Sequence, residues 1–336
     1  MENDVILRVK DLKTFFYTNE RCNRAINGVS FDIKKGKTLS IVGESGCGKS
    51  VTAASIMQLL PELSRIEEGE ISYFTEEGEV RIDKLKKNGK TMRNLRGSDI
   101  AMIFQDPMTA LNPVYTIGFQ IVENLRAHTK MTRKQAKARS VELLSLMGIP
   151  NPEQRVNEYP HQFSGGMRQR AMIAMAMSCN PKVLIADEPT TALDVTIQAQ
   201  IFELMMNLKN DFDTAILLIT HDMGVVNEVS DDMAVMYMGN IVESGGTKQV
   251  IRDPAHPYTK ALLQSIPILG KGRNQKLEPI RGSTPDPYQR PVGCQFRERC
   301  DYATKECLVM PPEVMVAPGQ MVRCWNHEEV QGHGKK

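Results

Sequence analysis

Short apolar runs, bounded by glycine, proline and charged residues, predict a sheet of buried strands. The runs at 38–42, 99–104, 182–186 and 215–220 consist mainly of apolar residues. Such runs are typical of parallel strands that are covered on both faces. Segments with helical spacing of apolar residues lie between them. This alternation of strands and helices predicts an α/β fold with a parallel sheet core.

Shorter alternating runs predict an antiparallel β subdomain beside that core. The runs at 7–12 and 28–33 alternate apolar and polar residues, and 69–82 fits a β-hairpin. Aromatic residues stand between the first two runs, where a ring either stacks on an adenine base or packs at the strand end. We choose Phe16 for the stacking position.

A long helical pattern interrupts the predicted strands. Residues 116–148 have apolar residues three and four apart, with lysine, arginine and glutamine on the other face. We therefore predict a helical subdomain, about 106–165, within a larger domain of residues 1–250. A linker rich in glycine, lysine and proline follows Leu263, and residues 251–336 are predicted to form a small cysteine-rich extension.

Composition and charge narrow the range of partners. The 336 residues are 24% charged and 41% hydrophobic, with a net charge of +2, so no strong positive field gathers nucleic acid. The acidic N-terminus does not resemble a signal peptide. The longest apolar run, 171–177, is far shorter than the roughly 18 residues of a membrane span. Any membrane connection is therefore expected to come from partner chains.

The segment GESGCGKS at 43–50 predicts a phosphate-binding loop. It follows the apolar run 38–42 and precedes a helical pattern, which is the context that such a loop needs. Its glycines let backbone N–H groups turn inward, and the helix N-terminus favours negative charge. Cys47 is expected to be a small filler residue close to the nucleotide. We predict that ATP is bound by Phe16 together with Gly43, Glu44, Ser45, Gly46, Cys47, Gly48, Lys49, Ser50 and Val51.

Polar side chains follow three of the predicted core strands. Gln105, the pair Asp187 and Glu188, and His221 each come directly after an apolar run. Ligands of open α/β sheets bind at the carboxyl ends of strands. Asp187 is expected to hold Mg²⁺ with Ser50, and Glu188 to polarise the attacking water. His221 is expected to contact the γ-phosphate.

A second anion-binding pattern lies at 164–167. Ser164, Gly165 and Gly166 open a predicted helix, where N–H groups and a hydroxyl face an anion. The methionines that follow, such as Met172 and Met175, are expected to fill core gaps. Asp194 ends a turn and caps the next helix.

Taken in order, these motifs resemble the ATP-binding subunit of an ABC transporter over residues 1 to about 245. The resemblance implies the ABC nucleotide-binding fold of P-loop NTPases and a dimer closed head to tail, in which Ser164, Gly165, Gly166 and Met167 contact the partner's ATP. It also implies that Glu188 is the general base, that Ser50, Gln105 and Asp187 hold Mg²⁺, that His221 senses the γ-phosphate, and that Asp194 belongs to the D-loop. Phe163 and Met167 replace the usual Leu and Gln, which leaves contact details at the fifth signature position open.

The tail resembles the oligopeptide and dipeptide importer branch, in the run HPYTKALL at 256–263 and again at 293–300. That resemblance implies a motor at the cytoplasmic face of the membrane, with a second and paralogous ATPase, two membrane permease subunits and an external substrate-binding protein. Nickel importers share much of this tail, so nickel is an alternative cargo.

Four cysteines crowd into the tail: Cys294, Cys300, Cys307 and Cys324. In a chain without an export signal they are soft metal ligands rather than a disulfide framework. Zinc sites usually begin with a closer cysteine pair, and four thiolates also suit a 4Fe-4S cluster. The resemblance implies such a cluster, while zinc and unliganded thiols stay as alternatives.

Two other classes of protein compete with a transport motor. Soluble ABC ATPases that act on DNA or ribosomes usually carry a coiled coil or a tandem repeat, and the sequence has neither a heptad run nor a second GxxxxGKS. A regulatory domain that binds ATP without hydrolysing it is disfavoured by Glu188 and His221.

Overall fold

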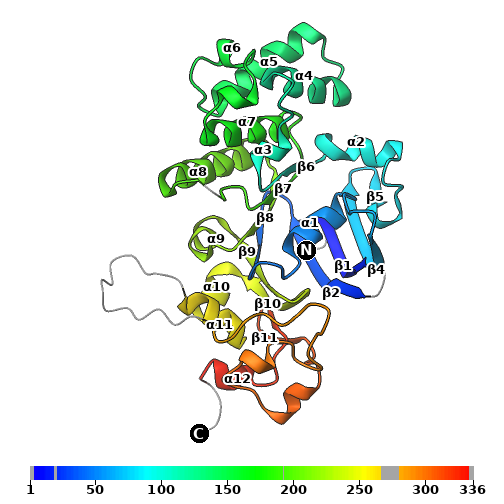
Figure 1. Ribbon diagram of the computed structural model, residues 1–336, viewed down its shortest axis with the longest axis vertical. Helices are drawn as coiled ribbons and strands as arrows, with labels where there is room; N and C mark the ends of the chain where they lie inside the picture. The colour runs from blue at the N-terminus through cyan, green and yellow to red at the C-terminus, as the bar shows by residue number, and fades with distance from the viewer. Residues whose placement is uncertain (1–3, 19–20, 192, 266–279, 333–336) are drawn as a thin grey trace.

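A computed structural model describes residues 4–18, 21–191, 193–265 and 280–332 (Figure 1). Its centre is an eight-stranded sheet in the order β11-β12-β10-β9-β3-β8-β7-β6. The five strands from β9 to β6 are parallel, which confirms the predicted α/β class with a parallel core. The eight strands are β3 (Thr38–Val42), β6 (Ile100–Ile103), β7 (Val183–Asp187), β8 (Ala215–Thr220), β9 (Asp232–Tyr237), β10 (Asn240–Gly246), β11 (Val314–Ala317) and β12 (Gln320–Val322).

A second, four-stranded antiparallel sheet lies beside the first, in the order β2-β1-β4-β5. Its strands are β1 (Val5–Tyr17), β2 (Cys22–Lys34), β4 (Ser64–Thr75) and β5 (Gly78–Arg81). The predicted hairpin is the β4–β5 pair. The aromatic residues that we expected between two strands, Phe16 among them, belong to β1. A bulge near Asp11, whose φ is 47°, breaks the alternation and made the strand look shorter in the sequence.

Helices α3 to α6 lie within 106–165, the range that we predicted for a helical subdomain, and α4, α5 and α6 stand at one end of the molecule (Figure 1). Thr116 and Thr132 cap α4 and α5, and the apolar sides of both helices pack with α7 in one buried cluster. The helices of this region are α3 (Pro107–Ala110), α4 (Ile117–His128), α5 (Arg133–Leu146), α6 (Pro152–Arg155) and α7 (Gly165–Met177).

The remaining helices connect and cover the strands. They are α1 (Lys49–Ile56), α2 (Lys90–Ser98), α8 (Val195–Phe212), α9 (Met223–Val229), α10 (Thr247–Arg252), α11 (Pro257–Gln264) and α12 (His327–Val330). In the described part of the chain no helix is both long and apolar enough to cross a membrane.

The C-terminal extension lies at the end opposite α4–α6 (Figure 1). Its strands β11 and β12 continue the main sheet, because β12 pairs with β10 in antiparallel fashion. The sequence did not indicate this pairing. Most of the predicted linker, residues 266–279, lies outside the described residues.

Candidate functional site

The loop between β3 and α1 has the backbone that its glycines predict. Gly43, Gly46 and Gly48 have φ values of 155°, 79° and 110°, which residues with a side chain rarely adopt. A Cβ atom on Gly43 would lie 2.2 Å from the Met236 carbonyl oxygen, so the loop packs too closely for any larger residue there. Helix α1 begins at Lys49 and directs its N-terminus toward the loop.

Lys49 is buried within the loop, with 5% of its surface exposed. Its Nζ donates hydrogen bonds to the carbonyl oxygens of Gly43, at 2.7 Å, and Glu44, at 3.1 Å. Ser50 donates from Oγ to Oδ1 of Asp187 at 3.0 Å. Burial raises the pKa of the Asp187 carboxyl, and the hydrogen bond from Ser50 opposes that rise. A cation bound by the Asp187 carboxylate and the Ser50 hydroxyl would offset the free-energy cost of burying the charged carboxylate.

Glu188 is the centre of a network that joins three strand ends. Its Oε2 accepts from Gln105 Nε2 at 3.0 Å and from the Thr191 hydroxyl at 3.1 Å. His221 Nδ1 lies 3.5 Å from the other carboxylate oxygen, Oε1. Strands β6, β7 and β8 are neighbours in the parallel sheet, so their carboxyl ends bring these side chains together.

The backbone of Glu188 adopts an unusual conformation. Its φ of 45° lies in the left-handed region, which costs a residue with a side chain about 1–2 kcal/mol. Its N–H donates to the Ile219 carbonyl on β8 at 2.8 Å, which holds the residue in place. The fold thus maintains a strained backbone at the carboxylate that we predicted to be catalytic.

One cavity collects most of the predicted nucleotide-binding residues. Phe16, at the end of β1, lines it, so the aromatic ring stands beside the phosphate loop as expected for a stacking residue. Asn23 and Ala25 on β2 also line it, and nothing in their sequence marked them in advance. The remaining lining residues are Ser45, Gly46, Gly48, Lys49, Ser50, Val51, Gln105 and Glu188.

Two residues of the predicted ATP-binding set direct their side chains elsewhere. The Glu44 carboxylate turns away to Arg299 in the C-terminal extension. Cys47 is buried, with 2% exposed, and burial raises the pKa of its thiol. A buried and protonated thiol is a poor nucleophile, which agrees with the expectation that Cys47 is a filler residue.

The predicted signature residues stand at the first turn of α7. Ser164 caps this helix and accepts from the Met167 N–H, and the capping residue and Gly165 are exposed. Asp194 caps α8 in the same way, and a Cβ on Gly166 would lie 3.2 Å from Ile197 at the start of α8. The two helix starts are therefore neighbours. Within the described chain, neither of them lines the cavity at Lys49.

The four tail cysteines line one small cavity with His256 and Phe296. Burial raises the thiol pKa of Cys294, that of Cys300 to about 11 and that of Cys324 to about 12, and the nearby cysteines add to each rise. Among the residues described, no three His, Cys, Asp or Glu side chains are grouped so that they could hold a metal ion. The four thiols therefore line one cavity, but their arrangement in the described residues does not support the predicted 4Fe-4S cluster or the zinc alternative.

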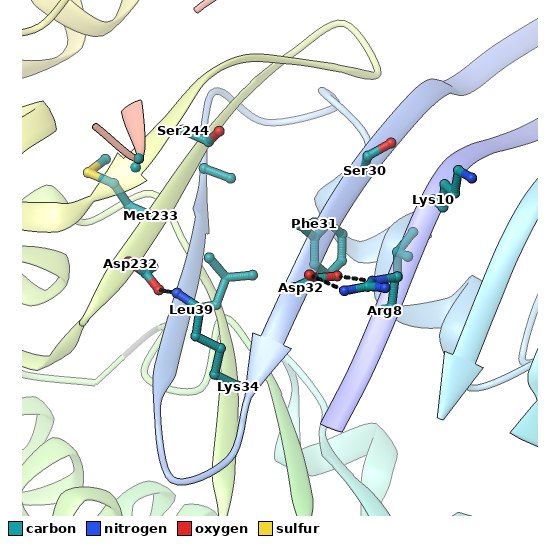
Figure 2. Close-up of a pocket in the computed structure, with 14 residues that line it drawn as sticks. Arg8, Lys10, Ser30, Phe31, Asp32, Lys34, Leu39, Asp232, Met233 and Ser244 are labelled. Carbon is teal, nitrogen blue, oxygen red and sulfur yellow. Dashed lines mark hydrogen bonds and ion pairs between the residues drawn. The ribbon is translucent and has the colours of Figure 1, made fainter. Parts of the chain in front are cut away.

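A larger cavity, of 550 Å³ against 260 Å³ at the phosphate loop, lies between the two sheets (Figure 2). Arg8 makes a two-point ion pair with Asp32 at 2.7 and 2.8 Å, and Lys34 pairs with Asp232 at 2.8 Å. None of the predicted site residues lines it, so size does not mark the functional site here.

The arrangement at the phosphate loop is suited to hydrolysis of a nucleoside triphosphate. Backbone N–H groups and Lys49 can bind phosphate oxygens, Ser50 and Asp187 can bind a divalent cation, and Glu188 can accept a proton from water. The Ser164 turn is not among the residues that line this cavity.

Known proteins resemble this chain over most of its length. Residues 26–191 match the family model "ABC transporter", and 242–307 match "Oligopeptide/dipeptide transporter, C-terminal region". A probable peptide ABC transporter ATP-binding protein of Sinorhizobium fredii is 49% identical over 97% of this chain and 96% of its own length. A dipeptide transport ATP-binding protein of Bacillus subtilis is 48% identical over 98% of this chain and 96% of its own length. An oligopeptide transport ATP-binding protein of the same organism is 51% identical over 95% of this chain and 88% of its own length.

Solved structures resemble about three quarters of the chain. The dimeric ATP-binding cassette MJ0796, in a post-hydrolysis state with ADP and phosphate, is 25% identical with a TM-score of 0.63. The match covers 72% of this chain and 98% of that one.

Proposed function

The chain belongs to the ABC transporter ATP-binding proteins, and from this premise we propose that it is the ATP-hydrolysing motor subunit of an importer for dipeptides or oligopeptides. The Glu188 carboxylate, held between Gln105 and His221 beside the phosphate loop, is the observation that carries the proposal. A chain that only bound ATP would not need a base at this place.

The residues divide the chemistry between them. The loop N–H groups and Lys49 bind the phosphates of the substrate ATP, and Phe16 supports the adenine. Ser50, Asp187 and Gln105 would hold Mg²⁺, which offsets phosphate charge when it is bound. Glu188 takes the proton of the attacking water at Oε1, because Oε2 already accepts from Gln105 and Thr191. His221, next to Oε1, orients the carboxylate and contacts the γ-phosphate.

Hydrolysis needs a second ATPase chain. Closure head to tail brings Ser164, Gly165 and Gly166 of one chain to the ATP of the other, with Met167 and Asp194 at the same junction. The second N–H cluster neutralises the γ-phosphate, and closure excludes bulk water from Glu188. ATP binding therefore favours the closed pair, and hydrolysis releases it. We expect the second chain to be a paralogue rather than a copy of this one.

Transport requires membrane partners. We propose two permease subunits, with one docking on the helical subdomain that α3–α6 form, and an external substrate-binding protein that selects the cargo. The motor is then peripheral at the cytoplasmic face of the membrane. Peptide cargo is favoured over nickel because the relatives described above carry dipeptide, oligopeptide or peptide transport in their names.

Copurification tests this assembly. The tagged full-length chain, recovered from detergent-solubilised membranes, is expected to bring two integral membrane proteins and a second ATPase with it. Their absence, together with recovery of ribosomes or DNA, would favour a soluble ABC ATPase instead.

We propose that Cys294, Cys300, Cys307 and Cys324 hold a 4Fe-4S cluster that braces the extension. Support comes from the four thiols sharing one cavity, and from the donor set, because such clusters take four thiolates. The described residues include no group of three or more His, Cys, Asp or Glu side chains placed to hold a metal ion, so the proposal rests on the shared cavity and the donor set. The small core of the extension explains why a brace is useful.

Iron content gives a direct test. The chain purified without oxygen is expected to contain iron and to absorb broadly at about 400 nm, where thiolate clusters absorb. Cys300→Ser should lose most of both signals, while Cys179→Ser, which changes a cysteine outside the tail, should keep them. A wild-type sample with zinc or without metal would contradict the cluster.

A further inference from the structure

Glu44, the second residue of the phosphate loop, is held by the C-terminal extension. Arg299 Nη1 donates to its Oε2 at 2.6 Å, and Nη2 donates to its Oε1 at 2.9 Å. The Thr284 hydroxyl adds a hydrogen bond to Oε2 at 3.3 Å. A contact that spans 255 residues thus connects the tail to the loop that binds phosphate.

The Arg299–Glu44 pair is shielded from solvent. The Arg299 side chain is 5% exposed and that of Glu44 is 28% exposed. The guanidinium lies over the rings of Tyr237 and Phe296, at 5.9 and 5.7 Å, and its Nε donates to the Arg281 carbonyl at 2.8 Å. The hydrogen bonds with Glu44 raise the pKa of Arg299 further above its usual range. Two-point pairs of this kind are stronger and more directional than exposed ion pairs.

Tyr258 holds the backbone of the same residue. Its hydroxyl accepts a hydrogen bond from the Glu44 N–H at 2.8 Å. The ring is fully buried in α11 and packs against Tyr237 and Phe296, with centroids 4.7 and 5.3 Å apart. Both the side chain and the N–H of Glu44 are therefore fixed from the extension.

These contacts matter most when a nucleotide arrives. In the structure, the Glu44 carbonyl is also held by Lys49 Nζ at 3.1 Å. A bound phosphate would compete with the loop carbonyls for the three donors of Lys49. Arg299, Tyr258 and the more weakly bonded Thr284 hold Glu44 independently of Lys49. Arg299 is followed directly by Cys300, which lines the cavity of the four cysteines. The residue that holds Glu44 and the cysteine cavity therefore belong to one short segment.

We propose that Arg299 and Tyr258 are positioning residues for the ATP phosphates, which hold Glu44 and so make nucleotide affinity depend on the C-terminal extension. This inference rests on the proposed ATP site. It assigns to the extension a part in ATP binding, in addition to any structural part of its cysteines.

Arg299→Gln tests the inference through nucleotide affinity. Equilibrium binding of a fluorescent ATP analogue to the full-length chain should weaken about tenfold, with KM raised more than kcat is lowered, because a charge-assisted pair is lost. The double variant Arg299→Gln/Glu44→Gln should regain most of that affinity, since the unpaired carboxylate no longer opposes phosphate charge. Tyr258→Phe, which keeps the ring, should weaken binding by about threefold.

Arg281→Gln is the matched control, because it removes an exposed arginine–carboxylate pair of the same extension, with Asp301 at 2.6 Å, and should bind as the wild type does. Wild-type affinity in Arg299→Gln would overturn the inference. The inference would also be overturned if the affinity lost in Arg299→Gln were not regained in the double variant and were matched by a fall in Tm. That result would mean that Arg299 contributes to folding alone.

Lys49→Ala in the same assay separates the two proposals. If it binds like the wild type, the proposed ATP site itself is wrong. If it loses binding while Arg299→Gln does not, only the positioning inference fails.

Discussion

Glu188→Gln should lower ATP hydrolysis at least 100-fold while ATP affinity stays within about twofold of wild type. The amide has the size of the carboxylate and can still meet Gln105 and Thr191, but it cannot accept a proton from water. Removal of a positioned general base typically costs 10²–10⁴ in rate. ATP binding depends on the loop and Lys49, which the substitution leaves intact.

Phosphate release at saturating ATP and Mg²⁺, measured on the assembled complex, checks the rate, and equilibrium binding of the ATP analogue checks affinity. Glu203→Gln is the control, because Glu203 is exposed on α8 and should keep wild-type turnover. Unchanged phosphate release in Glu188→Gln would exclude Glu188 as the base. Loss of ATP binding in that variant would instead assign the carboxylate a structural part in the site.

Lys49→Ala should weaken ATP binding at least 100-fold and thereby stop turnover. Lys49 is the buried cation of the loop, and in a site from which water is partly excluded a charge-assisted contact to phosphate is strong. The substitution also removes the hydrogen bonds to the carbonyls of Gly43 and Glu44, so the empty loop loses two restraints.

Equilibrium binding and Tm should be measured together, so that lost affinity is separated from lost folding. Lys248→Ala, an exposed lysine on α10, serves as the control and should leave affinity unchanged. Wild-type affinity in Lys49→Ala would remove the basis for a phosphate site at this loop.

Local sequence was enough to predict several core strands and the polar residues at their carboxyl ends. Strand β7 is wholly buried, so its run of apolar residues carried a clear signal. Asp187 ends this strand and Glu188 follows it directly. The phosphate loop was equally plain, because only glycine tolerates φ values such as those of Gly46 and Gly48.

Predictions failed or stayed incomplete where a local pattern was broken or where the partner lay far away. The bulge at Asp11 interrupted the alternation of β1, so the strand was predicted too short and its aromatic residues were assigned to a connection. The phosphate-loop motif placed Cys47 close to the nucleotide, but it did not indicate how deeply the thiol is buried. The thiol packs closely against Gly43, which only the tertiary structure shows.

The sequence by itself determined the core strands β3, β6, β7 and β8 and the phosphate loop, because periodicity and glycine positions act over a few residues. Strands β9 and β10, which continue the same sheet, were not predicted. Only the tertiary structure decided that β12 continues the sheet at β10 and that Arg299 holds Glu44. These contacts join residues that are distant along the chain, and their pairing follows from how the whole core packs. No local pattern records such a pairing, since many arginines and carboxylates are available and folding selects among them.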